Sequence, residues 1–162
     1  MYNQTALRSG KKKMISIENR KARFDYEVAD KFEAGVELVG SEVKSIRLGH
    51  ANLGDSFCFV ENGEIFLKNC FVASYEKGSY YNEDERRKRK LLLHKYEIRR
   101  LIGKTKEKGY TLVPLKMYFK GQRVKVEIAL AKGKKQFEKK QTIKERDLVR
   151  DMDRQVSDLK RR

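Results

Sequence analysis

The chain has 162 residues, and its 39 Lys and Arg against 23 Asp and Glu give a formal net charge of +16 at pH 7. A chain of this length can fold as one compact domain with a tail. So large a positive charge attracts polyanions, which makes nucleic acid the first partner to consider, with an ordinary basic protein as the alternative. No apolar run approaches the ~20 residues that cross a bilayer, and no secretory signal or lipidation pattern is present. We therefore expect a cytoplasmic protein with no membrane partner.

Residues that could support catalysis or bind a metal are few and scattered. Two cysteines, Cys58 and Cys70, lie in apolar runs, which predicts reduced, partly buried thiols. Together with His50 and His94 they are too widely spaced for a zinc site. The sequence also has no glycine-rich phosphate loop and no recognisable pairing of a nucleophile with its base. We expect no metal, no cofactor and no enzymatic activity.

The first third of the chain predicts an arm, a strand and a short helix. Residues 1–18 are polar and lack periodicity, which predicts a flexible N-terminal arm. From about Phe24 alternating apolar residues predict a strand that is bent at glycines. The segment SEVKSIRLG then predicts a helix that Ser41 caps and Gly49 ends.

Two β-hairpins are the clearest local signals. In the first, β-rich runs flank Asn62-Gly63, a pair typical of a type I′ turn. In the second, alternating runs flank Gly121, one face is polar, and Pro114 indicates an edge or bulge position. These hairpins predict a mainly β fold with peripheral helices, in the form of a small antiparallel OB-fold-like β-barrel. The pattern gives the hairpins and leaves their closure into a barrel open.

Between the hairpins lie a predicted loop and a predicted helix. Residues 74–88 are polar and contain three tyrosines, which could stack on unpaired bases or pack against the domain. A helix is then expected from near Glu83 or Asp84 to Gly103, with Leu91 and Leu92 on its apolar side.

The C-terminal segment is basic and poor in apolar residues. Val149, Met152, Val156 and Leu159 form a narrow stripe at helical spacing, too small to pack a core, and such a helix is marginal alone in water. We therefore expect an N-terminal arm at 1–18, a domain at 19–131, and a flexible basic tail at 132–162. The tail is predicted to be disordered when free and helical when docked, with a helix folded back on the barrel as the alternative.

Basic residues gather in three places within the predicted domain. They are the segments NRKAR at 19–23, KSIR at 44–47 and RRKRK at 86–90. Each could simply be a solvated surface. Several clusters in one small domain favour RNA binding, because each phosphate contact releases condensed counterions and the contacts accumulate.

A set of ordered motifs resembles SmpB, the SsrA-binding protein family, from about residue 19 to 146. The most specific segments are FEAG at 32–35 followed by GSEVKSIR at 40–47, with RKLLL at 89–93, GYTLVPL at 109–115 and AKGKK at 131–135. The resemblance implies an OB-fold barrel that binds the tRNA-like domain of transfer-messenger RNA and, with the elongation factor Tu complex, delivers it to stalled ribosomes. It also implies a tail that enters the empty mRNA channel at the small-subunit decoding centre. We expect a monomer; the alternative is a general single-stranded nucleic-acid-binding or ribosome-associated OB protein.

The basic clusters and the resemblance together give two candidate sets of residues. Cations would bind phosphates, while an amide or carboxylate would read hydroxyls or base edges. The RNA-binding set is Asn19, Arg20, Lys21, Arg23, Glu33, Lys44, Arg47, Arg89, Lys90, Leu92 and Lys125. The ribosome-binding tail set is Gly133, Lys134, Lys135, Glu138, Lys139, Lys140, Ile143, Lys144 and Arg146. Farther along, the family's tryptophan is replaced by Leu148.

Overall fold

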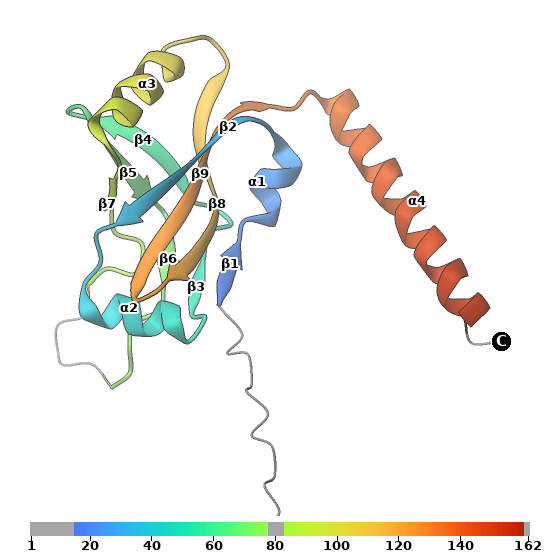
Figure 1. The fold of residues 1–162 in the computed structure, drawn as a ribbon, viewed down its shortest axis with the longest axis horizontal. Helices are drawn as coiled ribbons and strands as arrows, with labels where there is room; N and C mark the ends of the chain where they lie inside the picture. Colours follow the sequence, from blue (N-terminus) through green and yellow to red (C-terminus); the bar gives the residue numbers. More distant parts are fainter. Residues whose placement is uncertain (1–14, 78–82, 161–162) are drawn as a thin grey trace, which may run out of the picture.

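A closed ring of antiparallel strands forms the body of the molecule (Figure 1). The computed structural model describes residues 15–77 and 83–160. The elements follow in the order β1 (Ser16–Glu18), α1 (Arg20–Asp25), β2 (Tyr26–Val36), α2 (Gly40–Arg47), β3 (Ala51–Asn52), β4 (Phe57–Glu61), β5 (Glu64–Lys68), β6 (Phe71–Val72), β7 (Arg89–Leu92), α3 (Lys95–Thr105), β8 (Tyr110–Lys120), β9 (Arg123–Gly133) and α4 (Gln136–Lys160).

Closure of the ring comes from one pairing that the sequence left open. The sheet runs β1-β8-β4-β5-β7-β2-β9, and β9 also pairs with β8. All of these pairings are antiparallel, and β3 and β6 form a separate small sheet. The predicted mainly β class with peripheral helices is therefore confirmed. No helix in the described parts of the chain is long and apolar enough to cross a bilayer.

Both predicted hairpins are present. Asn62 and Gly63 connect β4 to β5 with φ of 50° and 73°, as a type I′ turn requires. Gly121, with φ of 63°, helps to turn β8 into β9. The register between those strands shifts between Pro114 and Lys116, where the bulge accommodates a residue that has no ladder donor.

Apolar side chains form two cores because β8 changes the face that it buries at this bulge. Leu112 and Met117 belong to the main core inside the ring, which α2 and α3 close at opposite ends through Ile46 and Leu101 (Figure 1). A smaller core lies outside the ring, where α1 covers residues that include Leu115. The polar outer face predicted for this hairpin therefore exists only beyond the bulge.

Three local predictions were wrong. Residues 89–92, expected in a helix, form β7, because they complete the sheet between β5 and β2. Residues 16–18, expected in the arm, pair with β8, while residues 1–14 of that arm lie outside the described residues. The helix expected to be capped by Ser41 has its N-cap two residues earlier, at Val39, and Glu42 accepts from the Val39 N–H at 3.0 Å.

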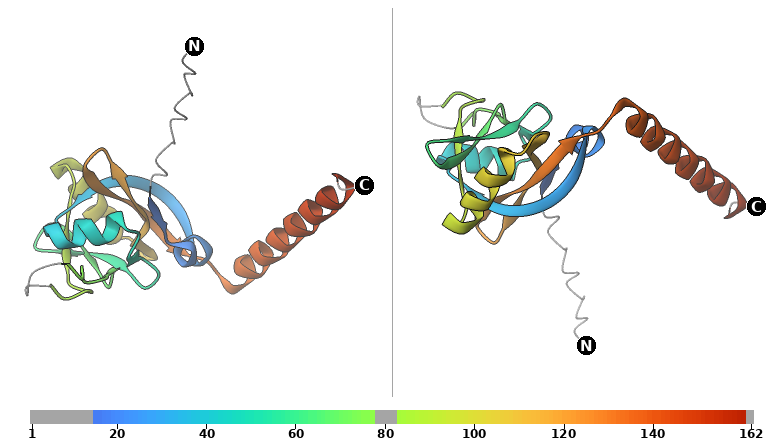
Figure 2. Two further views of the ribbon diagram at one scale, coloured as in Figure 1. Left: turned by 90° about the horizontal axis from the view of Figure 1, so that it is seen from below. Right: turned by 90° about the horizontal axis from the view of Figure 1, so that it is seen from above.

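Helix α4 leaves the ring at the end of β9, next to α1, and projects away from it in all three views (Figures 1 and 2). None of its residues is buried, so it is not the folded-back helix considered above. Strand β9 continues to Gly133, two residues beyond the expected end of the domain. The expectation that the tail is disordered until it docks stays a prediction.

Candidate nucleic-acid interface

Helix α1 presents three of the predicted RNA-binding cations, Arg20, Lys21 and Arg23, all exposed on one short helix. Asn19 holds this helix in place. Its Oδ1 accepts from the N–H of Ala22 at 3.0 Å, and its Nδ2 donates to the carbonyls of Leu53 at 2.9 Å and Pro114 at 3.0 Å. Asn19 is only 2% exposed. In the free protein Asn19 therefore positions α1, and a contact of its side chain with RNA stays a prediction.

A second group of predicted residues meets on the opposite part of the sheet. Glu33 of β2, Leu92 of β7 and Lys125 of β9 line one hollow of about 460 Å³, although they are far apart in sequence. Gly35 lies opposite both Leu92 and Lys125 in the register, and a Cβ there would come within 3.2 Å of the Leu92 Cβ. The small residue thus lets β7 approach β2 closely. Leu92 remains 52% exposed, as an apolar contact to a partner requires.

Hydrogen bonds fix the carboxylate of Glu33 at the rim of this hollow. It accepts from the hydroxyl of Tyr118 and from Nζ of Lys120 at 2.9 Å. The bonds from Tyr118 and Lys120, with the nearby charge of Lys125, hold the pKa of Glu33 below its ordinary value. Burial and the bond to Glu33 raise the pKa of Tyr118 to about 12, so the phenol stays a neutral donor. Glu33 is therefore an oriented acceptor at neutral pH.

Helix α2 presents two more predicted contacts, Lys44 and Arg47, both exposed. Nζ of Lys44 lies 5.3 Å from the centroid of the Tyr75 ring, and the Arg47 guanidinium carbon lies 5.3 Å from that of Phe119. Tyr75 therefore packs on a cation of the domain, one of the two roles considered for the loop tyrosines. The other two, Tyr80 and Tyr81, lie outside the described residues.

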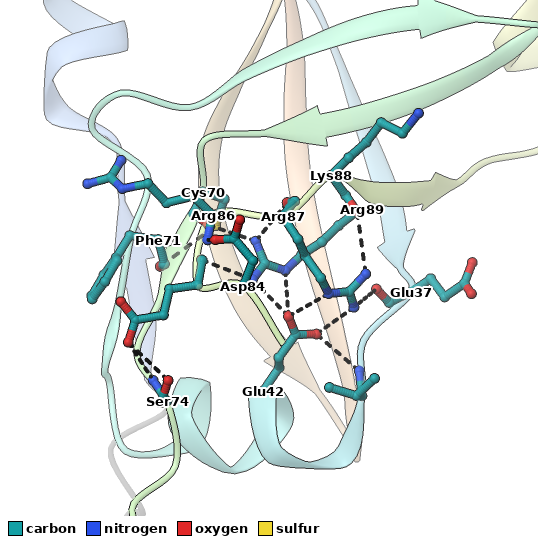
Figure 3. A network of polar contacts seen from close by, with 12 residues as sticks. Glu37, Glu42, Cys70, Phe71, Ser74, Asp84, Arg86, Arg87, Lys88 and Arg89 are labelled. Atoms are coloured by element: carbon teal, nitrogen blue, oxygen red, sulfur yellow. Dashed lines mark hydrogen bonds and ion pairs between the residues drawn. The ribbon is translucent and has the colours of Figure 1, made fainter. Parts of the chain in front are cut away.

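Arg89 is buried in the free protein and not a surface cation, so its role as an RNA contact stays a prediction that this burial argues against. It is 0% exposed and donates to Glu42 Oε1 from Nε at 3.0 Å and from Nη2 at 2.8 Å (Figure 3). It also donates to the carbonyls of Cys70, Arg87 and Glu85. The buried guanidinium joins the end of the long loop to α2. Its neighbour Lys90 does reach the surface, where Nζ lies 2.6 Å from a carboxylate oxygen of Glu64.

Arg87 joins the same cluster from the loop side. Its Nε and Nη2 donate to the two carboxylate oxygens of Glu42, at 2.9 and 2.7 Å (Figure 3). Burial raises the pKa of Glu42, but the bonds from Arg87, the Val39 N–H and Arg89 outweigh it and hold this pKa below its ordinary value. The cluster is therefore ionised at neutral pH and fixes α2, with its exposed cations, relative to β7.

Predicted tail residues occupy the junction between the ring and α4. The N–H of Lys134 donates to the Asp25 carbonyl at 2.9 Å, and Nζ of Lys139 lies 2.9 Å from an Asp25 carboxylate oxygen. Arg146 lies over Phe24, with its guanidinium carbon 5.4 Å from the ring centroid. These contacts join the start of α4 to α1. The remaining tail residues are Gly133 at the end of β9, Lys135 before α4, and Glu138, Lys140, Ile143 and Lys144 along it.

Sequence reasoning missed two aromatic side chains beside Leu92. His94 and Tyr96 line the same hollow as Glu33 and Lys125. The only signal for them in the sequence was the segment HKY at 94–96, in which two aromatic residues flank a lysine. The two cysteines are free and more deeply buried than the partly buried thiols predicted. Within the described ranges no group of three or more His, Cys, Asp or Glu is placed to hold a metal ion.

Comparisons with known proteins agree with the resemblance found in the motifs. The profile of the SmpB protein family matches residues 16–158. An SsrA-binding protein of Carboxydothermus hydrogenoformans is 54% identical over 140 residues, covering 86% of this chain and 94% of that protein. One of Clostridium botulinum is 54% identical over 144 residues, covering 89% and 92%.

A solved structure shares the fold as well as the sequence. It is described as "tmRNA-SmpB: a journey to the center of the bacterial ribosome", is 56% identical, and superposes with a TM-score of 0.63 over 75% of this chain and 85% of that one. SmpB is a family of RNA-binding proteins and not of enzymes. The ring of strands, the motifs and the matches over most of the chain lead to one conclusion: the chain belongs to the SmpB family.

Proposed function

We propose that this chain binds the tRNA-like domain of transfer-messenger RNA and delivers it to stalled ribosomes for trans-translation. The observation that carries the proposal is the hollow in which Glu33, Leu92 and Lys125 meet from three different strands. The SsrA-binding names of relatives that are 54% identical, and a solved relative described with tmRNA and the ribosome, support it. No catalytic step is required of the chain.

The domain would hold the RNA through two surfaces, the hollow that contains Glu33 and Lys125 and the exposed cations of helix α1. The hollow combines two kinds of contact. Lys125 supplies a charge for a phosphate, and the oriented carboxylate of Glu33 accepts from a base amino group or a 2′-hydroxyl. Because an acceptor cannot attract phosphate, Glu33 contributes selectivity, whereas Lys125 contributes affinity. Helix α1 would add phosphate contacts about 23 Å away along β2, the contour length of the seven residues from Tyr26 to Glu33.

The tail would report an mRNA-free channel at the small-subunit decoding centre. Helix α4 has no buried residue, and apart from the contacts of Lys139 and Arg146 with α1 its surface is available to a polyanionic channel. An isolated helix of this kind is marginal in water, and docking would supply the contacts that keep it folded. In this proposal the protein acts as a cytoplasmic monomer and reaches the ribosome together with the elongation factor Tu complex.

Truncation separates the two ends of the adaptor. A chain that stops after Lys135 keeps all of β9, so the ring should bind the tRNA-like domain with nearly unchanged affinity. The same chain should fail to support peptide tagging on stalled ribosomes in a reconstituted translation system. A large loss of affinity on truncation would refute this division of labour. Equal binding of a tRNA-like RNA and an unstructured RNA at matched salt would instead indicate a general single-stranded nucleic-acid-binding protein.

A further inference from the structure

His94 and Tyr96 form a pair of stacked rings at the junction of β7 and α3. Their centroids are 5.6 Å apart and their planes differ by 12°. His94 is the N-cap of α3, and its N–H donates to Oε2 of Glu97 at 3.0 Å, which fixes the backbone that carries both rings. Tyr96 is nevertheless 69% exposed. A large aromatic side chain held in place and left uncovered is available to a partner.

The surroundings of the rings decide which kind of partner fits. Both rings line the hollow that also contains Leu92 and Lys125. Helix α3 also carries Lys95, Arg99 and Arg100, which lie outside the lining of the hollow, and Nη2 of Arg100 is 3.1 Å from a carboxylate oxygen of Asp30. Beside the aromatic face the hollow has one cation, Lys125, and two carboxylates, Glu33 and Glu97. This combination complements a nucleotide, because the cation can bind a phosphate, the rings can stack on a base, and the carboxylates can accept from its amino group or from a 2′-hydroxyl. A protein partner would instead need a wider apolar surface than one leucine and one tyrosine provide.

We propose that the His94–Tyr96 pair is a stacking platform for one unpaired base of the bound RNA, with Lys125 beside it for the adjoining phosphate. The inference rests on the proposed function and adds a base-binding position to it. Tyr96 presents its ring to the base, and His94 supports it from the other side. The platform favours an unpaired nucleotide, because a base within an RNA double helix is stacked on both sides and has no free face.

The test is to measure dissociation constants of full-length variants for a transcribed tRNA-like domain and for an unstructured RNA of equal length, over a range of salt. Tyr96→Ala should weaken binding of the tRNA-like domain roughly tenfold, the lower part of the range for one stacked base. The loss should be equal at every salt concentration, because stacking releases no counterions. Tyr96→Phe should bind within about twofold of the unsubstituted chain, whereas Tyr96→Leu should lose as much as Tyr96→Ala, since only a ring can stack.

Phe137→Ala is the matched control, since Phe137 is 77% exposed on α4 and lies outside the hollow. It should leave affinity unchanged, and thermal melts should show that no variant is unfolded. The platform is refuted if Tyr96→Ala binds like the unsubstituted chain, or if Tyr96→Leu binds like Tyr96→Phe. If the unsubstituted chain binds both RNAs equally, the proposed function fails, and the Tyr96 series on the unstructured RNA then decides whether the platform exists.

Discussion

Replacing Glu42 by Ala should cost more stability than any other single change to a charged residue on α2. Only 7% of the Glu42 side chain is exposed, and its two oxygens accept from Arg87, Arg89 and the Val39 N–H. The substitution leaves the guanidinium of Arg89, which is 0% exposed, with backbone carbonyls as its remaining partners. Removing one partner of such a buried pair costs about 3–5 kcal/mol, because the other charge stays buried without compensation.

Thermal unfolding followed by circular dichroism measures this loss, since the chain has no tryptophan. We expect the midpoint to fall by roughly 10–20 °C, as a 3–5 kcal/mol loss implies for a domain of this size. Asp55→Ala is the control, because its pair with Lys21 is 65% and 70% exposed and should contribute less than about 1 kcal/mol. A loss below about 1 kcal/mol for Glu42→Ala would refute the assignment of a buried ionic cluster.

The pH dependence gives a second check with a milder variant, Glu42→Gln. Hydrogen bonds hold the native pKa of Glu42 below its ordinary value of 4.5, so the unfolded chain binds this proton more readily. The stabilisation is therefore complete above about pH 4.5 and is lost as the pH falls through the native pKa. Glu42→Gln has no such proton to bind, so its stability should decline less steeply below pH 4.5. An identical slope for the two chains would contradict the pKa assignment.

Other substitutions test the remaining assignments. Asn19→Ala should lower stability by about 1–3 kcal/mol in a denaturant titration, because it removes a helix cap and leaves buried carbonyls unpaired. Unchanged stability would contradict its role in positioning α1. Lys125→Ala should reduce the slope of log affinity against log salt by about 0.7–0.9, and an unchanged slope would mean that it binds no phosphate. The thiols of Cys58 and Cys70 should react with a disulfide reagent only on unfolding. Burial raises the pKa of both thiols, that of Cys70 to about 11, so little thiolate is present in the folded chain. Prompt reaction of the folded chain at pH 8 would contradict their burial. Removing residues 136–162 should shift the melting midpoint by less than about 2 °C, because α4 buries no residue, and a larger shift would show that α4 packs on the ring.

Local patterns predicted the hairpins of the fold but misassigned segments whose structure depends on distant partners. The turns at Asn62-Gly63 and Gly121 follow from residues that tolerate positive φ. Residues 89–92 have good helix formers, and only pairing with β5 and β2 makes them a strand. Helix α1 has no apolar periodicity in its six residues, and it forms because Asn19 caps it and Ala22 is buried beneath it.

Prediction of the candidate site was limited in the same way. The basic run at 86–90 predicted Arg89 as a phosphate contact. Its partner Glu42 lies 47 residues away in the sequence, so the burial of this pair can be recognised only from the structure. Glu33 is the converse case. It carries the wrong sign for an RNA-binding surface, and the family resemblance alone marked it. The structure then brings it together with Lys125 and Leu92.

Carboxylates partly neutralise the positive charge of the ring in the free protein, and the exposed ion pairs differ in role from the buried ones. Lys21 pairs with Asp55 and Lys90 with Glu64, on side chains that are about one-third or more exposed. Exposed pairs contribute about 0–1 kcal/mol each, so a phosphate can displace these carboxylates at little cost. The buried pairs to Glu42 cannot be exchanged in this way, because separation would leave a charge without a partner. The same types of residue thus serve two purposes: buried pairs fix the geometry of the surface, and exposed pairs keep its cations available to RNA.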